Sequence, residues 1–274
     1  MKEPEPVHTV DLFPVERRQL IDLLESLSES EWALPTVCAG WSVKDVALHV
    51  LGDDIGVLSR KRDGHSSATE RLDSWEELVA FLNDWNERWV GAARRISAPL
   101  LIELLHLTGD ASHSYFASLD LHEMGGPVSW AGPEPAPVWL DVAREYTERW
   151  LHQQQIRNAV KRPGGKEPEL FAPVLATFVH ALPQTFRDVD SPEGTHVKLT
   201  IAGESGGEWS VVREAKGWGL YVDVTSEPHA SVLIDQERAW RLFTKGIDKM
   251  ESDAKVKGDH ALGERLLDTV SIIA

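Results

Sequence analysis

The first part of the chain repeats apolar residues every three or four positions, which is the period of an α-helix. The segment 100–124 is also compatible with a helix, although Gly109 interrupts it. The segment 126–137 is so rich in Pro and Gly that it predicts a loop. The amphipathic helices that the period predicts span residues 11–28, 42–60, 74–96 and 138–160.

Two helix ends carry recognisable signals. Ser42 stands where the second helix should begin, and Asp45 occupies the capping-box position three residues later, in place of Glu or Gln. The sequence Arg162-Pro-Gly-Gly165 should end the long helix that starts near residue 138, because Pro and Gly stop helices. These signals fix where two of the predicted helices start and stop.

Beyond residue 165 the period of the apolar residues changes from that of a helix to that of a strand. After a short apolar helix over 171–186, alternating segments separated by Gly-rich turns predict strands over 195–201, 208–213, 217–224 and 230–234. Asp235 should cap a helix through Phe243, and another helix should begin near Gly258. We therefore expect an all-helical domain over residues 1–165 and a smaller α+β domain over 166–274.

Composition narrows the class of protein. The 274 residues carry a formal net charge of -16, with a pI near 5.1, so the surface should repel phosphate backbones and nucleic acid is not an expected partner. The sequence contains no run of about 18 apolar residues, so it does not predict a membrane-spanning helix. The first residues are charged and Pro-rich rather than apolar, so we predict a cytoplasmic protein. The single cysteine, Cys38, rules out an intrachain disulfide framework and a Cys-based zinc cluster.

Three residues on two predicted helices could form a metal site. His49 lies on the helix over 42–60, and Glu148 and His152 lie four residues apart on the helix over 138–160, hence on one face. Two imidazoles and one carboxylate can hold a divalent transition metal and leave positions open to water or substrate. Spacing alone leaves the alternative that these are three unrelated polar residues.

Two segments resemble the mycothiol-dependent maleylpyruvate isomerase family, within the DinB-like helical bundles. They are Trp32-Ala-Leu-Pro-Thr-Val-Cys-Ala-Gly-Trp-Ser-Val-Lys-Asp-Val-Ala-Leu-His49 and Arg144-Glu-Tyr-Thr-Glu-Arg-Trp-Leu-His-Gln-Gln-Gln-Ile-Arg157. The part from Thr195 through Gly263 resembles the sterol-carrier-like domain that often follows in this family. The resemblance implies an up-and-down four-helix bundle followed by a sterol-carrier-like α+β domain.

The resemblance also implies a chemistry. The family's three metal ligands correspond to His49, Glu148 and His152, its usual metal is zinc, and its characterised members use a low-molecular-weight thiol at the metal. A metal-bound thiol loses its proton readily and becomes nucleophilic. The implied function is a mycothiol-dependent isomerase or transferase acting on a small electrophile. The alternative is a non-catalytic metal- or ligand-binding module of the same superfamily.

Four further residues have open roles. Asp53, four residues after His49, could be a fourth ligand, an acceptor that supports a ligand, or a solvated acid. Gln155 stands where the family often has an acidic residue, so it can hydrogen-bond a substrate but cannot act as a base. Arg157 could bind an anionic substrate or the thiol's carboxylate, or form a surface ion pair. Cys38 has no basic neighbour in sequence, which favours a buried structural thiol over a nucleophile.

Overall fold

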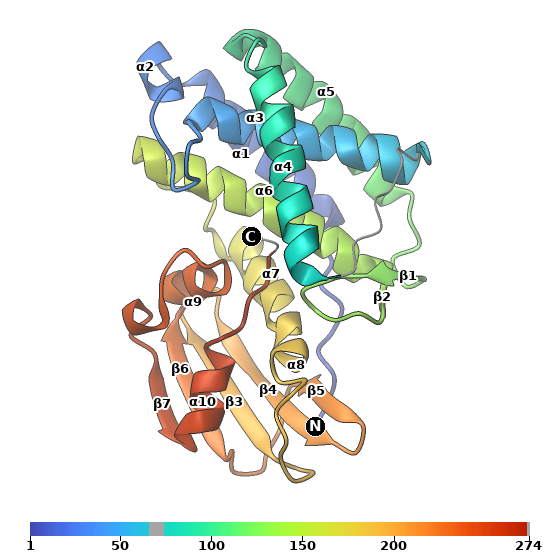
Figure 1. The fold of residues 1–274 in the computed structure, drawn as a ribbon, viewed down its shortest axis with the longest axis vertical. Coiled ribbons are helices and arrows are strands. Elements are labelled where there is room, and N and C mark those ends of the chain that lie inside the picture. The colour runs from blue at the N-terminus through green and yellow to red at the C-terminus, as the bar shows by residue number, and fades with distance from the viewer. Residues whose placement is uncertain (66–73, 273–274) are drawn as a thin grey trace. The chain divides into compact units, whose positions relative to one another are not determined.

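The computed structural model describes residues 1–65 and 74–272, which fall into two compact units (Figure 1). We call Thr9–Asp120 with Glu145–Gly165 the helical unit. We call Met1–His8, Leu121–Arg144 and Lys166–Ala274 together the sheet unit. Among the described residues, none of the helices combines the length and apolar character that crossing a membrane requires.

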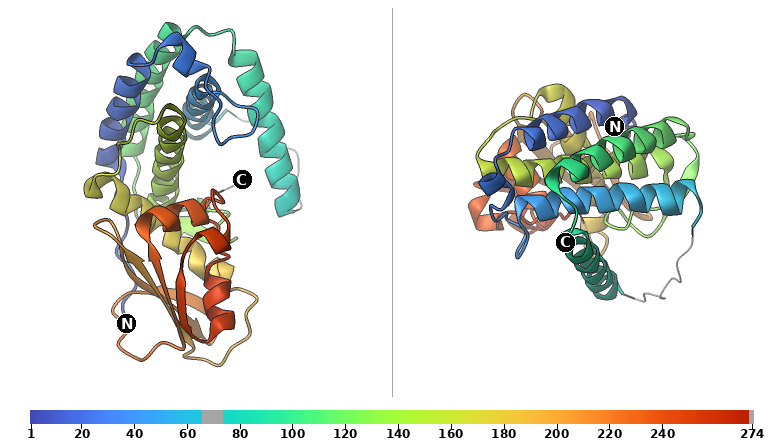
Figure 2. Two further views of the ribbon diagram at one scale, coloured as in Figure 1. Left: turned by 90° about the vertical axis from the view of Figure 1, so that its left-hand side faces the viewer. Right: turned by 90° about the horizontal axis from the view of Figure 1, so that it is seen from above.

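The helical unit is built around long helices. Figure 2 shows α1, α3 and α5 running side by side, whereas α4 crosses them at a wide angle. Its elements are η1 (Val10–Leu12), α1 (Phe13–Glu25), α2 (Glu29–Trp32), α3 (Val43–Gly56), η2 (Val57–Arg62), α4 (Trp75–Ala93), α5 (Ala98–Ala117) and, from Glu145 on, α6 (Val138–Val160).

One hydrophobic core joins these helices. It takes buried residues from α1, α3, α5 and α6, and all of its buried members lie between Leu20 and Val160. Removing this apolar surface from water is the main favourable term in holding the helices together. The predicted cap of α3 is confirmed: Ser42 Oγ accepts from the Asp45 amide, and Asp45 Oδ2 accepts from the Ser42 amide at 3.0 Å.

The structure corrects one expectation in the helical unit. Gly109 does not interrupt the helix, because α5 continues through it. A Cβ there would lie 3.0 Å from Arg17 Cγ, so the glycine makes room for that side chain to cross α5. The connection after α1 also contains a short helix, α2, whose Ser28 and Glu31 form a full capping box.

The sheet unit holds a five-stranded sheet of order β5-β4-β3-β6-β7, in which β3 and β6 are parallel and the other pairs antiparallel. Helices α9 and α10 pack against its strands. The elements are β1 (Met124–Pro127), β2 (Pro135–Pro137), α7 (Pro168–Phe178), η3 (Val179–Ala181), α8 (Leu182–Thr185), β3 (His196–Ala202), β4 (Gly207–Glu214), β5 (Gly217–Tyr221), β6 (Ala230–Asp235), α9 (Gln236–Phe243), η4 (Lys249–Glu251), β7 (Lys255–Gly258) and α10 (His260–Leu266).

The fold class, a helical part followed by an α+β part, is confirmed. Two details of the sheet unit differ from the sequence analysis. The segment 126–137 is not all loop, because β1 and β2 pair across it, and β7 at the sheet edge was not predicted. Residues 1–8 and 121–144 group with the sheet unit rather than with the helices. The division into domains at residue 165 stays a prediction.

Candidate metal centre

Two helical pairs meet in the helical unit. His49 and Asp53 follow each other by one turn on α3, and Glu148 and His152 do so on α6. The rings of His49 and His152 stand edge to face with centroids 4.5 Å apart. One ligand atom from each of His49, Asp53 and His152 lies within 4.8 Å of the others. The structure thus brings residues about a hundred positions apart to one spot.

The two carboxylates flank this pair of histidines. Asp53 Oδ2 lies 3.4 Å from His49 Nε2, and Glu148 Oε2 lies 3.8 Å from His152 Nε2. Two ligand atoms on one tetrahedral zinc ion are separated by roughly 3.3 Å, since each bond is about 2.0–2.1 Å long. The spacing of His49, Asp53 and His152 therefore fits a divalent metal such as zinc, whereas the predicted ligand Glu148 lies outside this group of atoms within 4.8 Å of one another. Asp53 is placed beside the histidines rather than out in solvent.

Burial sets the protonation of this group. It lowers the pKa of His49 well below the usual value, and His152 and Arg149 lower it further. His49 is therefore a neutral imidazole at pH 7, the form that binds metals. Burial also raises the pKa of Asp53 to about 6, although the nearby charges of His152 and Arg149 act in the opposite direction.

The loop before α3 lies against both histidines. Trp41 packs on His49 with ring centroids 5.2 Å apart. Cys38 Sγ lies 3.3 Å from Gln155 Oε1, and the same oxygen lies 2.8 Å from His152 Nδ1. Burial raises the pKa of the Cys38 thiol, so the thiol keeps its proton at pH 7. Cys38 is more than a hundred positions from Glu148 and His152 in sequence, yet the fold places it beside Gln155 at the site.

Arg157 lies on another face of α6. Its Nε donates to Gln153 Oε1 at 2.9 Å, and its Nη2 donates to the Gln19 carbonyl at 3.3 Å. These contacts join α6 to α1 and give Arg157 a structural role in the helical unit. A contact between Arg157 and a substrate or thiol stays a prediction.

A buried ion cluster lies directly behind the site, and sequence reasoning missed it. Asp54 is fully buried and accepts from Arg17 Nη1 at 2.7 Å, from Arg149 Nη2 at 2.8 Å and from Thr108 Oγ1 at 2.7 Å. Burial alone would raise the pKa of Asp54, but the two guanidinium groups hold it below its usual range. The signal in the sequence was a pair of arginines within apolar helical stretches, where buried charges need partners.

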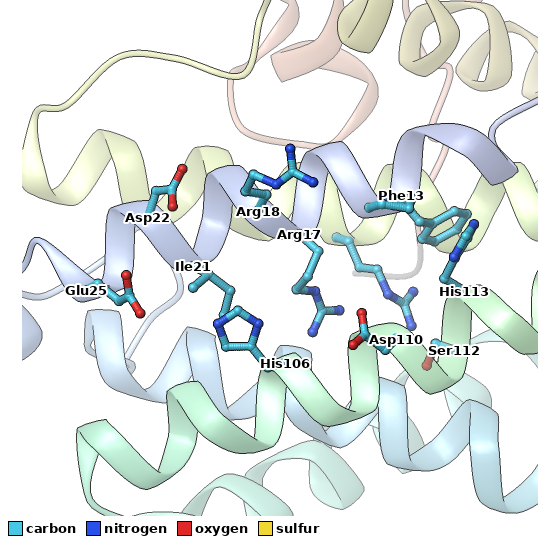
Figure 3. A pocket seen from close by; sticks show the side chains of 13 residues that line it. Phe13, Arg17, Arg18, Ile21, Asp22, Glu25, His106, Asp110, Ser112 and His113 are labelled. Carbon is cyan, nitrogen blue, oxygen red and sulfur yellow. The ribbon is translucent and has the colours of Figure 1, made fainter.

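The same cluster borders a pocket between α1 and α5. Figure 3 shows Arg17 between these helices, with His106 on one side of it and Ser112 and His113 on the other. The pocket has a volume of about 380 Å³. Neither His106 nor His113 belongs to the group formed by His49, Asp53 and His152.

The model of the mycothiol maleylpyruvate isomerase N-terminal domain matches residues 13–157, which is more than half of the chain. The chain belongs to this family. The match includes all of the residues of the candidate centre and ends at Arg157. The family resemblance of the sequence is thereby confirmed.

Two solved structures have a similar fold. A mycothiol-dependent maleylpyruvate isomerase aligns with a TM-score of 0.56 and 12% identity, covering 90% of this chain and 91% of that one. A histidine-to-alanine mutant of a mycothiol-dependent maleylpyruvate isomerase aligns with a TM-score of 0.52 and 12% identity, covering 85% and 86%. At this identity the likeness shows the fold alone. No curated protein matches the sequence.

Proposed function

We propose that this member of the maleylpyruvate isomerase family is a metal-dependent enzyme that uses a low-molecular-weight thiol, such as mycothiol, to isomerise or modify a small electrophile. The observation that carries the proposal is the convergence of two imidazoles and a carboxylate, within 4.8 Å, from α3 and α6. Family membership supports the same chemistry, since the similar solved structures are mycothiol-dependent isomerases.

In this proposal His49, His152 and Asp53 hold the metal, most simply zinc, and Glu148, which the family resemblance names as a ligand, lies 3.8 Å from His152 Nε2. A divalent cation held by two neutral imidazoles and a carboxylate stays positive, which favours the thiolate form of a bound thiol. Trp41 packs against the His49 ring, with the two ring planes tilted by 53°. The protonated thiol of Cys38 is a poor nucleophile, so the reactive sulfur comes from outside the chain.

Metal analysis tests the first half of the proposal. Purified protein should contain about one zinc ion per chain, and the double variant His49→Ala with His152→Ala should contain none. The matched control, His106→Ala with His113→Ala, removes two histidines from α5 and should keep the metal. Full metal content in the first double variant would contradict the site.

Cobalt substitution tests the thiol. Added mycothiol should produce a thiolate-to-cobalt charge-transfer band, and Cys38→Ser should show the same band. If the guanidinium of Arg157 also binds the thiol, Arg157→Ala should weaken mycothiol binding by about 1–3 kcal/mol. A chain that binds metal but responds to no cellular thiol would instead be a non-catalytic metal- or ligand-binding module. Loss of the band in Cys38→Ser alone would mean that the protein's own sulfur takes part.

A further inference from the structure

A ring nitrogen of His152 and the thiol of Cys38 converge on one oxygen beside the candidate metal centre. Gln155 Oε1 lies 2.8 Å from His152 Nδ1 and 3.3 Å from Cys38 Sγ. An amide oxygen accepts hydrogen bonds and never donates them, and its two lone pairs can receive two donors. Gln155 is one turn from His152 on α6, so the first contact follows from helical spacing.

The contact determines which nitrogen of His152 carries the proton. A neutral imidazole has one N–H and one bare nitrogen. If Gln155 Oε1 accepts at Nδ1, the proton is on Nδ1 and the lone pair is on Nε2. His152 Nε2 is also the nitrogen that lies 3.8 Å from Glu148, on the side of the candidate centre.

The second contact joins a loop to the same amide. Cys38 lies in the segment Pro35–Ser42, whose ends pair through an isolated β-bridge, with Thr36 N donating to the Trp41 carbonyl at 3.0 Å. Gly40 allows the turn, because its φ of 80° is one that other residues rarely adopt. The loop is therefore closed at its base, and it presents Cys38 to Gln155.

We propose that Gln155 is a positioning residue of the metal site, whose amide oxygen holds His152 as the Nδ1–H tautomer and is itself oriented by the Cys38 thiol. This inference rests on the metal site of the proposed function. It adds to the three ligands of that site a residue that orients one of them. Histidines that bind metals generally donate their second N–H to a carboxylate, a carbonyl or water, and loss of that acceptor weakens metal binding. Here a neutral amide takes this place, so the support adds no negative charge to the site.

The tautomer can be read directly in metal-free protein. In long-range proton–nitrogen spectra of protein labelled with ¹⁵N-histidine at pH 8, His152 should appear as the Nδ1–H form, with His152→Ala providing the assignment. Gln155→Leu should shift the population toward the Nε2–H form, and Gln155→Glu should retain Nδ1–H. A wild-type protein in which His152 is mainly Nε2–H would overturn the inference without any substitution.

Zinc affinity gives the second measurement. In competition with a chromophoric chelator, Gln155→Leu should bind zinc about 10–100-fold more weakly than wild type, because its ligand has lost the orienting acceptor. Gln155→Glu should bind at least as tightly as wild type. Asn158→Leu, which removes an exposed amide from the same helix, is the control and should bind like wild type. If Gln155→Leu does not fold, Gln155→Ser, too short to reach the ring, replaces it.

The outcomes separate the two proposals. A wild-type chain that binds no zinc refutes the metal site of the proposed function, whereas the tautomer of His152 can still be read. A wild-type chain that binds zinc, with equal affinity and tautomer in Gln155→Leu, refutes only the role of Gln155. Cys38→Ala should weaken zinc binding less than Gln155→Leu does. An equal loss would overturn the assignment of the orienting role to the amide.

Discussion

Asp54 of α3 and Arg149 of α6 form a fully buried ion pair with 2.8 Å between Oδ1 and Nη2. Each stands next in sequence to a residue of the candidate metal centre, Asp53 on one helix and Glu148 on the other. The ion pair therefore fixes the rotation of both helices at the level of the site. The hydrogen bonds of this ion pair require a particular geometry, so the pair sets which faces of α3 and α6 meet. Apolar contacts alone would allow more than one rotation of each helix.

Removing Asp54 should destabilise the helical unit strongly. Asp54→Ala leaves Arg17 and Arg149 buried without their shared carboxylate, and breaking a buried pair costs about 3–5 kcal/mol. Urea unfolding followed by circular dichroism measures the change. Asp84→Ala, which breaks an exposed pair with Arg88, is the control and should cost under about 1 kcal/mol. Equal effects of the two substitutions would contradict the role given to the cluster.

A side chain at Gly109 of α5 should crowd Arg17 and destabilise the helical unit. In Gly109→Ala the new Cβ would lie 3.0–3.2 Å from three atoms of Arg17, so that side chain must shift by a few tenths of an ångström, which strains its hydrogen bonds to Asp54. We expect a loss of about 1–3 kcal/mol in unfolding free energy. Gly91→Ala on α4 is the matched control, because its Cβ would meet no atom within 4 Å. Greater helix propensity should make that variant more stable by up to about 1 kcal/mol.

The two carboxylates beside the histidines should both affect metal binding. Glu148→Gln and Asp53→Asn each remove a negative charge next to the centre, and we expect zinc affinity to fall at least about tenfold, or ~1.4 kcal/mol, for each. Chelator competition measures the affinity. Asp22→Asn, at an exposed position of α1, should leave it unchanged. Wild-type affinity in Asp53→Asn would make Asp53 a solvated acid rather than part of the site.

Glu16 should make stability fall as pH rises. Burial raises the pKa of Glu16, outweighing the opposite effects of Arg17 and Arg149. The unfolded chain thus releases this proton at lower pH than the native protein, so stability declines from about pH 4.5 up to the folded pKa and is then constant. The slope due to one proton is at most about 1.4 kcal/mol per pH unit.

Substitution by an uncharged isostere should remove this dependence. Glu16→Gln keeps an oxygen for the Gln153 amide and should be more stable than wild type at pH 8 but not at pH 4.5. Urea unfolding at several pH values measures the difference. Glu25→Gln, an exposed position on the same helix, should show no such trend. A Glu16→Gln variant that is less stable at pH 8 would show that the carboxylate is ionised and needed.

The proposed boundary between about Arg162 and Glu169 can be tested by truncation. A chain of residues 1–163 should remain soluble, helical and metal-binding, because the buried helical core lies between residues 20 and 160. Its Trp130 and Trp139 lose Ala181, which shares their cluster in the sheet unit, so their fluorescence should shift to the red. Aggregation of the truncated chain would mean that the proposed domain needs the rest of the protein to fold.

Local rules accounted for much of the fold. The helical period located α1, α3, α4 and α6, and the Ser42 capping box marked the start of α3 because that motif acts within four residues. The strands β3 to β6 followed from alternation. The sequence did not predict the edge strand β7 or the paired strands β1 and β2. These short segments contain Gly, Pro or Lys and show no strand pattern of their own, so they become strands only by pairing with a neighbouring strand.

The candidate site likewise has features that the sequence predicted and features that only the tertiary structure decided. The sequence by itself determined that His49, Glu148 and His152 lie on two helices at spacings suitable for a metal, and family resemblance added their expected role. Only the tertiary structure decided that Gln155 and Cys38 meet at His152, since their contact spans 117 positions of the chain.

The tertiary structure also gives two acids that are adjacent in sequence different surroundings. Asp53 borders the histidines, whereas Asp54 pairs with the buried arginines. Successive helical residues point about 100° apart, so neighbours in sequence face different surroundings. Only packing determines which surroundings those are.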